Sequence, residues 1–307
     1  MDLPNYAYFK GEIVPYEKAK VGVLTHALNY GTAAFGGLRG YWNSEKEQLY
    51  IFRPFDHYHR LLNSAKILRM SINHTPENLT NITLNLLRRE GYRQDVYIRP
   101  LVFKSDEVIG VRLHDLKDEI SIVSIPFGLY VKNDTDAHLT VSSWRRIDDN
   151  VIPARGKISG AYANSSLIKS DAALNGFDDA VVLNQNGHIS EGSAMNIFMV
   201  RDGVLITPPV TENVLEGITR KSVITLAKKE LGLETLERPI DRTELLICDE
   251  VFLSGTAVQI TAATKIDHIP VGDGQIGPVA SKLREVFFNV VRGRDPSYQD
   301  WVTPVYA

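Results

Sequence analysis

The sequence has almost no cysteine and no long apolar run. Cys248 is the single cysteine among 307 residues, which excludes an internal disulfide, and its apolar surroundings at 245–248 predict a buried packing residue. No apolar stretch approaches the ~20 residues that a membrane-spanning helix needs. The opening residues, MDLPNYAYFKGE, lack a basic region followed by an apolar segment, so we expect no secretory signal and a soluble, cytoplasmic protein.

The sequence also lacks an excess of one charge. There are 34 Lys and Arg against 37 Asp and Glu, a formal net charge of -3. This balance gives no electrostatic reason to expect nucleic acid or an anionic membrane as a partner. The short arginine groups, at residues 88–89 and 145–146 and at Arg292 and Arg294, are expected to be solvated faces.

Several common catalytic and metal-binding motifs are missing. No G-x-S-x-G elbow, H-E-x-x-H pair or C-x-x-C pair occurs. His57 and His59 lie two apart on a predicted helix, so their side chains point to different faces and cannot share a metal ion. We therefore expect no metal site.

The first part of the chain mixes strand and helix patterns. Thr75 followed by Pro76 is typical of a helix start, and Gly91 of a helix end. This mixture predicts a small α+β domain over residues 1–125. The expected elements are a hairpin of 6–9 and 12–15 around Lys10-Gly11, a strand pair of 33–42 and 48–52, helices over 54–70 and from 76 to 91, and strands at 96–103 and 120–125.

Residues 126–137 (PFGLYVKNDTDA) bring proline, glycine, asparagine and aspartate close together, which predicts an interdomain loop. A larger domain is expected over residues 138–307. Its expected elements are strands at 138–144, 180–183, 188–192, 195–200, 204–207 and 251–254, with hairpin turns at Asn186-Gly187 and Asp202-Gly203, and helices over 161–174, 219–231 and 278–291.

Two segments carry residues suited to imine and pyridine chemistry. Lys157 lies in a loop between two glycines (RGKISGAY, 155–162), and a desolvated lysine can form an imine with an aldehyde. A solvated loop lysine is the commoner alternative. Glu191 ends a predicted strand, where a solvent-facing carboxylate is the commoner alternative to one that hydrogen-bonds a protonated pyridine nitrogen.

Two further segments can bind phosphate. Residues 215–220 (LEGITR) precede a predicted helix, so backbone N–H groups and the Thr219 hydroxyl meet at a helix N-terminus. An ordinary threonine N-cap is the alternative. Residues 254–257 (SGTA) leave a predicted strand and offer hydroxyls beside small residues, or form a plain turn.

In order and spacing these segments resemble the fold-type IV pyridoxal-phosphate enzymes, above all the branched-chain aminotransferases. The resemblance covers nearly the whole chain and implies a two-domain α+β fold of the fold-type IV class, with pyridoxal 5'-phosphate as the cofactor. The larger domain, residues 138–307, is expected to carry most of the cofactor site. The stretches that carry it are YFKGE at 8–12, HALNYGT at 26–32, HRL at 59–61, YIRP at 97–100, SEG at 190–192, GITR at 217–220 and SGTA at 254–257.

The resemblance also implies a role for each matching residue. Lys157 would carry the cofactor as a Schiff base and move protons, while Glu191 would bind the pyridine nitrogen. The rest of the cofactor would be bound by Arg60, Tyr162, Leu215, Gly217, Ile218, Thr219 and Thr256. The substrate pocket would be lined by Phe35, Gly37, Tyr97, Arg99, Tyr130, Thr256 and Ala257, with Tyr30 and Val111 reaching it from a second subunit of a homo-oligomer.

The implied reaction transfers the amino group of leucine, isoleucine or valine to 2-oxoglutarate, and a side activity on (R)-amines is expected. Alternatives on the same fold are a transaminase for D-amino acids or (R)-amines, an aminodeoxychorismate lyase-like enzyme, and a protein that holds the cofactor without turnover. Two departures from the family pattern bear on the substrate range. Gly36 stands where the family often has an acidic residue, and Phe127 where it often has tryptophan.

Overall fold

A computed structural model of the chain describes residues 3–128 and 134–306. Its contacts divide the chain into two compact units. The first unit contains Met1–Gly128, Gly156–Ala161 and Asn289–Ala307, and the second contains Leu129–Arg155 and Tyr162–Phe288.

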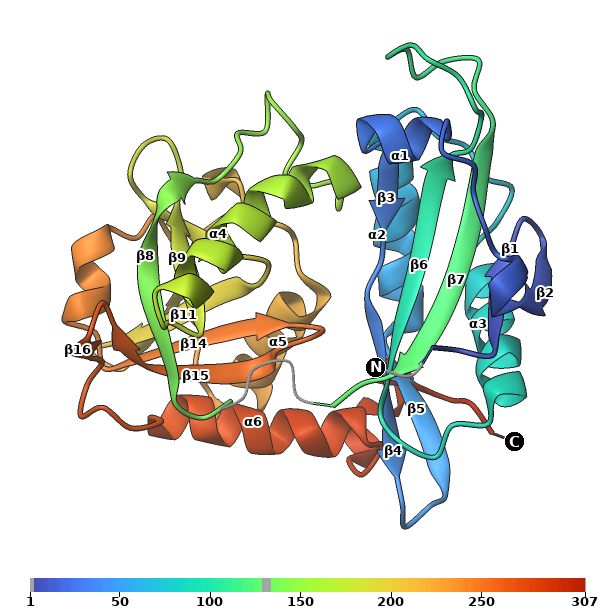
Figure 1. The fold of residues 1–307 in the computed structure, drawn as a ribbon. Coiled ribbons are helices and arrows are strands. Elements are labelled where there is room, and N and C mark those ends of the chain that lie inside the picture. The colour runs from blue at the N-terminus through green and yellow to red at the C-terminus, as the bar shows by residue number, and fades with distance from the viewer. Residues whose placement is uncertain (1–2, 129–133, 307) are drawn as a thin grey trace. The chain divides into compact units, whose positions relative to one another are not determined.

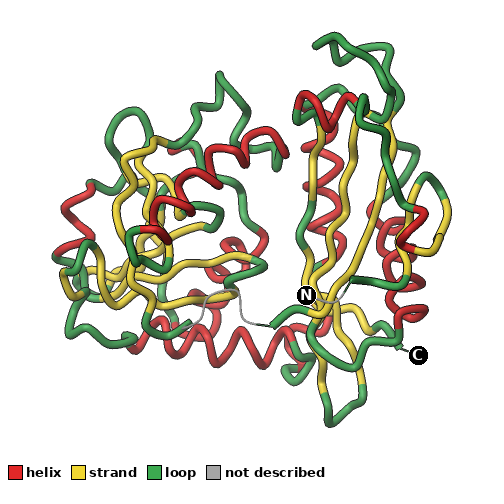
Figure 2. Tube along the Cα trace, viewed as in Figure 1, coloured by secondary structure: helices red, strands yellow, loops and turns green. Residues whose placement is uncertain are grey.

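The first unit is built on an eight-stranded sheet of order β17-β5-β4-β6-β7-β1-β2, with β3 also paired to β6. Helices α2 and α3 run alongside it (Figures 1 and 2). Leu61 of α2, Leu79 of α3 and Ile98 of β6 meet in one apolar core. The elements are β1 (Tyr6–Phe9), β2 (Glu12–Pro15), α1 (His26–Tyr30), β3 (Ala33–Phe35), β4 (Leu38–Asn43), β5 (Gln48–Phe52), α2 (Pro54–Ile67), α3 (Pro76–Glu90), β6 (Val96–Lys104), β7 (Asp118–Pro126) and β17 (Val302–Pro304).

Local chemistry explains where these elements begin and turn. Lys10 and Gly11 both have positive φ, 50° and 95°, as a tight hairpin turn requires, and β1 pairs with β2 as predicted. The Thr75 hydroxyl accepts a hydrogen bond from the Asn78 N–H at 3.2 Å, and Gly91 closes α3 at φ 73°. The predicted cap residues of this helix are therefore confirmed.

Two of the predicted elements in this unit were wrong in extent. The strand expected over 33–42 is interrupted at Gly36 and Gly37, so β3 pairs with β6, while β4 pairs with both β5 and β6. The helix expected to reach residue 70 ends at Ile67, and Arg69 takes a left-handed φ of 54°, which a continuing helix cannot contain.

The second unit is built on a nine-stranded sheet of order β10-β9-β8-β15-β14-β11-β12-β13, with β16 paired to β15. Helix α4 packs on β8 and β9, and α5 packs on β13 and β14 (Figure 1). The elements are β8 (Ala137–Arg145), α4 (Tyr162–Leu174), β9 (Asp179–Leu183), β10 (Ile189–Gly192), β11 (Asn196–Arg201), β12 (Val204–Thr207), α5 (Ile218–Leu231), β13 (Thr235–Glu237), β14 (Glu250–Gly255), β15 (Gln259–Ile266), β16 (Ile269–Pro270) and α6 (Pro278–Val291), whose last residues belong to the first unit.

The predicted antiparallel hairpins of this unit are present. Asp202 and Gly203, at φ 51° and 75°, turn β11 into β12, and Gly187, at φ 87°, lies in the turn from β9 to β10. Cys248 is buried in the apolar core as predicted, and burial raises the pKa of its thiol to about 12, which keeps it unreactive.

The compact units do not follow the expected boundaries of 1–125 and 138–307. The segment Gly156–Ala161 and the C-terminal Asn289–Ala307 lie with the first unit. The reason is backbone pairing: β17 pairs antiparallel with β5, and Ala34 forms a bridge with Ile158. The interdomain loop expected at 126–137 falls partly outside the described residues.

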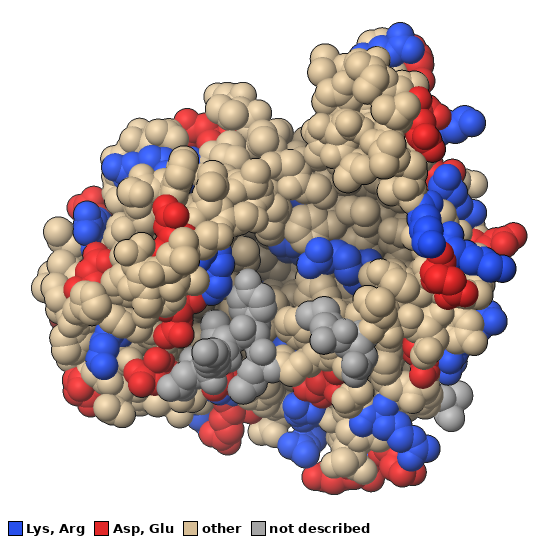
Figure 3. Space-filling model, in the orientation of Figure 1, with Lys and Arg blue, Asp and Glu red and all other residues tan. Residues whose placement is uncertain are grey.

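No helix among the described residues is long and apolar enough to cross a membrane. In the described part of the chain, no group of three or more His, Cys, Asp or Glu side chains is placed to hold a metal ion. Acidic and basic side chains are interspersed over the face seen in Figure 3.

Candidate active site

In the first unit, the peptide of Lys157 is held on both of its polar groups. Its N–H donates to the Ser64 hydroxyl oxygen at 3.1 Å, and its C=O accepts from the Phe35 N–H at 2.9 Å. The Lys157 ammonium lies 5.0 Å from the centroid of the Phe35 ring. The lysine is half-buried, so the commoner alternative of a fully solvated loop lysine does not describe it.

Helix α2 carries Arg60 and Ser64 one turn apart, and it also carries His57 and His59. His57 is buried and His59 is exposed, as their spacing predicted. Burial, together with the nearby charges of Arg60, Arg53 and Lys157, holds the pKa of His57 well below its ordinary value of 6.5. The side of α2 next to Lys157 is therefore cationic and keeps His57 neutral.

This electrostatic arrangement predicts acid sensitivity of the cofactor-free protein. Unfolded His57 takes up a proton below about pH 6.5 while folded His57 stays neutral, so stability is present above pH 6.5 and is lost as the pH falls below it. The slope is expected to reach about 1.4 kcal/mol per pH unit for one proton. Urea unfolding at pH 7.5, 6.5 and 5.5 measures it, and His57→Asn should flatten the dependence.

The exposed His59 on the same helix provides the control. His59→Asn should leave the slope as in the parent protein. If His57→Asn and the parent lose stability equally with falling pH, the assignment of this acid sensitivity to His57 is incorrect.

Four of the expected substrate residues of the first unit, Phe35, Gly37, Tyr97 and Arg99, form one cluster. Tyr97 and Arg99 lie two apart on β6, and Arg99 Nη2 donates to the Tyr97 hydroxyl at 3.1 Å. The Arg99 guanidinium lies over the Phe35 ring at 4.5 Å. A Cβ atom on Gly37 would lie 2.2 Å from the Tyr97 hydroxyl, so a larger residue here would displace the Tyr97 side chain. A Cβ on Gly36 would lie 2.7 Å from Pro100 Cγ, so the missing acidic side chain leaves no open space beside β6.

Tyr30 and Val111 lie at one end of the same unit. Tyr30 ends α1, and its hydroxyl accepts from the Gly110 N–H at 3.0 Å. His26 contacts the Gly110 carbonyl through Nε2 at 2.8 Å. Figure 1 shows α1 and the connection from β6 to β7 at this end of the unit. Val111 is 79% exposed.

In the second unit, Glu191 is buried rather than solvent-facing. One carboxylate oxygen accepts from the Leu215 N–H at 3.1 Å, and the other lies 3.0 Å from Arg146 Nη2. Arg146 also donates through Nε to the Asn213 carbonyl at 3.2 Å. The prediction of a solvated face at 145–146 was therefore wrong for Arg146. The sequence around Arg146 gives no sign of this ion pair, because its partner Glu191 lies far along the chain.

The segment that leads into α5 is hydrogen-bonded to Glu191 through the Leu215 N–H. Asn196 donates to the Leu215 carbonyl at 2.9 Å, and Leu215 leads to Gly217, the N-cap residue. No side chain caps this helix, so the alternative of a threonine N-cap at Thr219 is wrong. Thr219 is buried in the first turn. Uncapped N–H groups at a helix start are suited to bind an anion.

The segment 254–257 begins beside Asn196, which is bonded to Leu215. Ser254 of β14 stands opposite Asn196 of β11, and its buried hydroxyl has no hydrogen-bond partner among the described residues. Thr256 and Ala257 follow in the turn after β14. Tyr162 opens α4 in the same unit. Tyr130, also expected in the site, lies outside the described residues.

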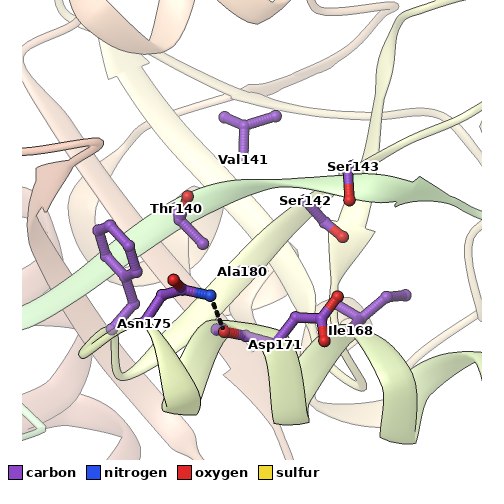
Figure 4. A pocket seen from close by; sticks show the side chains of 10 residues that line it. Thr140, Val141, Ser142, Ser143, Ile168, Asp171, Asn175 and Ala180 are labelled. Carbon is purple, nitrogen blue, oxygen red and sulfur yellow. Dashed lines mark hydrogen bonds between the residues drawn. The ribbon is translucent and has the colours of Figure 1, made fainter.

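A separate pocket in the second unit contains none of the expected site residues (Figure 4). It lies between β8 and α4, where Thr140 and Ser142 face Asp171 and Asn175. Asn175 there bonds the backbone of Asp171 at 2.8 Å. No buried charge or nucleophile is among the residues that line it, so we do not assign the chemistry to this pocket.

Comparison with known proteins agrees with these arrangements. Residues 44–266 match the family described as amino-transferase class IV. The chain belongs to this family. The chain is 48% identical to a probable branched-chain-amino-acid aminotransferase of Aquifex aeolicus (strain VF5), over 98% of this chain and 97% of that protein. The family and fold class predicted from the sequence are thus confirmed.

Solved structures give the same result for the aminotransferase fold. The branched-chain aminotransferase of Thermoproteus uzoniensis, solved with norvaline, has a TM-score of 0.95 and 41% identity, over 99% of this chain and 100% of that one. The branched-chain amino acid aminotransferase of Thermobaculum terrenum, solved in its PLP-form (holo-form), has a TM-score of 0.95 and 40% identity, over 100% of each chain.

Proposed function

We propose that this aminotransferase uses pyridoxal 5'-phosphate to move the amino group of leucine, isoleucine or valine to 2-oxoglutarate. The observation that carries the proposal is the fixed peptide of Lys157, next to the helix that bears Arg60. The names of its relatives support the substrate class, since the Aquifex aeolicus and Thermoproteus uzoniensis proteins are both branched-chain aminotransferases. The PLP-form of the Thermobaculum terrenum enzyme supports the cofactor.

The residues present have the chemistry that this cofactor needs. A phosphate dianion requires cations and N–H donors. Arg60 is a cation of the first unit, and the uncapped start of α5 offers N–H donors in the second. A protonated pyridine nitrogen requires a buried carboxylate, which Glu191 provides. When bound, the cofactor supplies an electron sink for the bond that breaks at the substrate α-carbon.

The protein's own residues would then do the binding and the proton transfer. Lys157 would hold the cofactor before the substrate binds. Once its Nζ is a free amine, it would take the proton from the substrate α-carbon and return it later. We propose these cofactor contacts: Arg60, Lys157, Tyr162, Glu191, Leu215, Gly217, Ile218, Thr219 and Thr256. We propose these substrate contacts: Tyr30, Phe35, Gly37, Tyr97, Arg99, Val111, Tyr130, Thr256 and Ala257.

We further propose a homo-oligomer in which Tyr30 and Val111 reach the site of a neighbouring subunit. An exposed apolar surface supports this, because such surfaces on single chains mark contacts with other molecules. The segments around Thr25 and Glu107 are joined by a backbone bridge. The exposed side chains on them are Val21, Val23, Leu24, Leu28, Val108, Ile109 and Val111. Sedimentation that finds only monomers would contradict the proposal.

Glu191→Gln should slow the half reaction with leucine by about 10²–10³-fold, while the fold is retained. A neutral amide holds the pyridine proton less well than a carboxylate, so the electron sink is weakened. Rapid-mixing absorbance of the bound cofactor measures the rate. Glu216→Gln, at an exposed position one residue after Leu215, is the matched control and should react at the parent rate. Equal rates in Glu191→Gln and the parent would contradict the role of Glu191.

A comparison of substrates tests the proposed reaction. With 2-oxoglutarate present, L-leucine should turn over much faster than D-leucine or an (R)-amine. Omitting 2-oxoglutarate should stop the reaction after a single turnover, because the amino group has no acceptor. Faster turnover of the D-amino acid or (R)-amine would favour those alternatives, and continued product release without 2-oxoglutarate would favour a lyase.

A further inference from the structure

Ser64 connects the two first-unit residues that the proposed function places at the cofactor. Its hydroxyl donates to the Arg60 carbonyl one turn earlier on α2, at 2.9 Å, and accepts from the Lys157 N–H, at 3.1 Å. One oxygen atom therefore joins the backbone of the phosphate-binding arginine to that of the cofactor-bearing lysine. Ser64 and Lys157 are 93 positions apart in the sequence.

The position of Ser64 makes this bond hard to replace. The side chain is fully buried, at 0% exposure, so bulk water cannot take over its role at the Lys157 N–H. A buried peptide N–H that loses its acceptor has no compensating bond, which is unfavourable. The hydroxyl also donates and accepts at once, and such chains of hydrogen bonds strengthen one another.

Other hydrogen bonds of this loop attach it to elements other than α2. The Lys157 carbonyl is held by Phe35, and Gly160 donates to the Gly31 carbonyl at 3.1 Å. These bonds attach the loop to β3 and to the end of α1. The Ser64 hydroxyl bonds the lysine peptide to the Arg60 helix.

From this geometry we infer that Ser64 is a positioning residue, which fixes the Lys157 backbone relative to Arg60. The inference rests on the proposed function of Lys157. The Lys157 Nζ lies at the end of a flexible side chain, so its reach is set by the peptide at the base of that chain. A misplacement of about 1 Å can cost about 10²-fold in rate when a proton must move between two fixed atoms.

The test compares Ser64→Ala, Ser64→Thr and a matched control, Thr80→Val. Thr80 is also buried on a helix of the first unit, and its hydroxyl donates to the Pro76 carbonyl one turn earlier, at 2.8 Å, far from Lys157 in sequence. The first readout is hydrogen exchange of the Lys157 amide in the full chain without cofactor. The second is the kcat and KM for leucine of the loaded enzyme.

We expect Ser64→Ala to speed exchange of the Lys157 amide about tenfold and to lower kcat about tenfold, with KM for leucine within about twofold. Ser64→Thr keeps the hydroxyl and should restore slow exchange. Thr80→Val should change neither readout. Unchanged exchange at Lys157 in Ser64→Ala, or an equal loss of kcat in Thr80→Val, would overturn the inference. Because the exchange readout needs no cofactor, it holds even if the parent enzyme proves not to transaminate leucine.

Discussion

Lys157→Ala should lower the rate of amino-group transfer by at least about 10⁴-fold. General acid–base help alone contributes roughly 10²–10⁴-fold, and the covalent link to the cofactor is lost as well. Cofactor should still bind noncovalently, because the variant leaves the proposed phosphate contacts, Arg60 and the start of α5, unchanged. Single-turnover absorbance of the bound cofactor after mixing with leucine measures the rate.

Two control variants separate the roles of Lys157. Lys157→Arg keeps the positive charge but cannot form the link, so it should be as inactive as Lys157→Ala. Lys66→Ala removes an exposed lysine of α2 and should retain full activity. If Lys157→Ala keeps more than about one percent of the parent rate, the assignment of the proton transfer to Lys157 fails.

Arg99→Ala should reduce kcat/KM for glutamate and 2-oxoglutarate by about 100-fold, and for leucine by less than about threefold. In the proposed reaction the enzyme accepts both an aliphatic side chain and a γ-carboxylate, and an apolar pocket penalises an unpaired carboxylate heavily. Arg99 is stacked on Phe35 and bonded to the Tyr97 hydroxyl, so its planar group is oriented before a carboxylate arrives.

Steady-state kinetics with each substrate measure this selectivity. Arg99→Lys keeps the charge but not the planar fork, so it should restore only part of the activity with glutamate. Arg93→Ala, which removes an arginine side chain that is 75% exposed, should behave as the parent. Equal losses with leucine and glutamate in Arg99→Ala would rule out selective recognition of the γ-carboxylate.

Local sequence chemistry was sufficient to predict most elements of the fold. Thr75, Pro76 and Gly91 each have a direct physical effect on the helix between them, and the structure places it there. Strand β15 was not predicted, because almost all of its residues are buried. A strand buried on both faces has no alternation of apolar and polar residues, and its sequence, QITAATKI, is rich in alanine and threonine.

Some residues of the candidate site could likewise be predicted from the sequence, and others could not. Lys157 and Glu191 stand out because glycines and small residues flank them in the sequence. Arg146 and Ser64 could not be identified from local patterns. Their partners, Glu191 and Lys157, are distant along the chain, and only the pairing of strands and the packing of the loop on α2 bring them into contact.

The division of the chain into two units also depends on backbone pairing between residues that are far apart in the sequence. Residues 302–304 carry no sign in the sequence that they return to β5, yet this pairing places the C-terminal segment in the first unit. The same holds for the Lys157 loop, which lies in the first unit although both of its flanking segments belong to the second.

The most direct test of the account identifies the lysine that carries the cofactor. The native, cofactor-loaded protein is reduced with borohydride and digested, and the peptide that bears the pyridoxyl group is sequenced by mass spectrometry. We expect a single labelled peptide containing Lys157. A label on any other lysine, or no label on a protein that transaminates leucine, would contradict it.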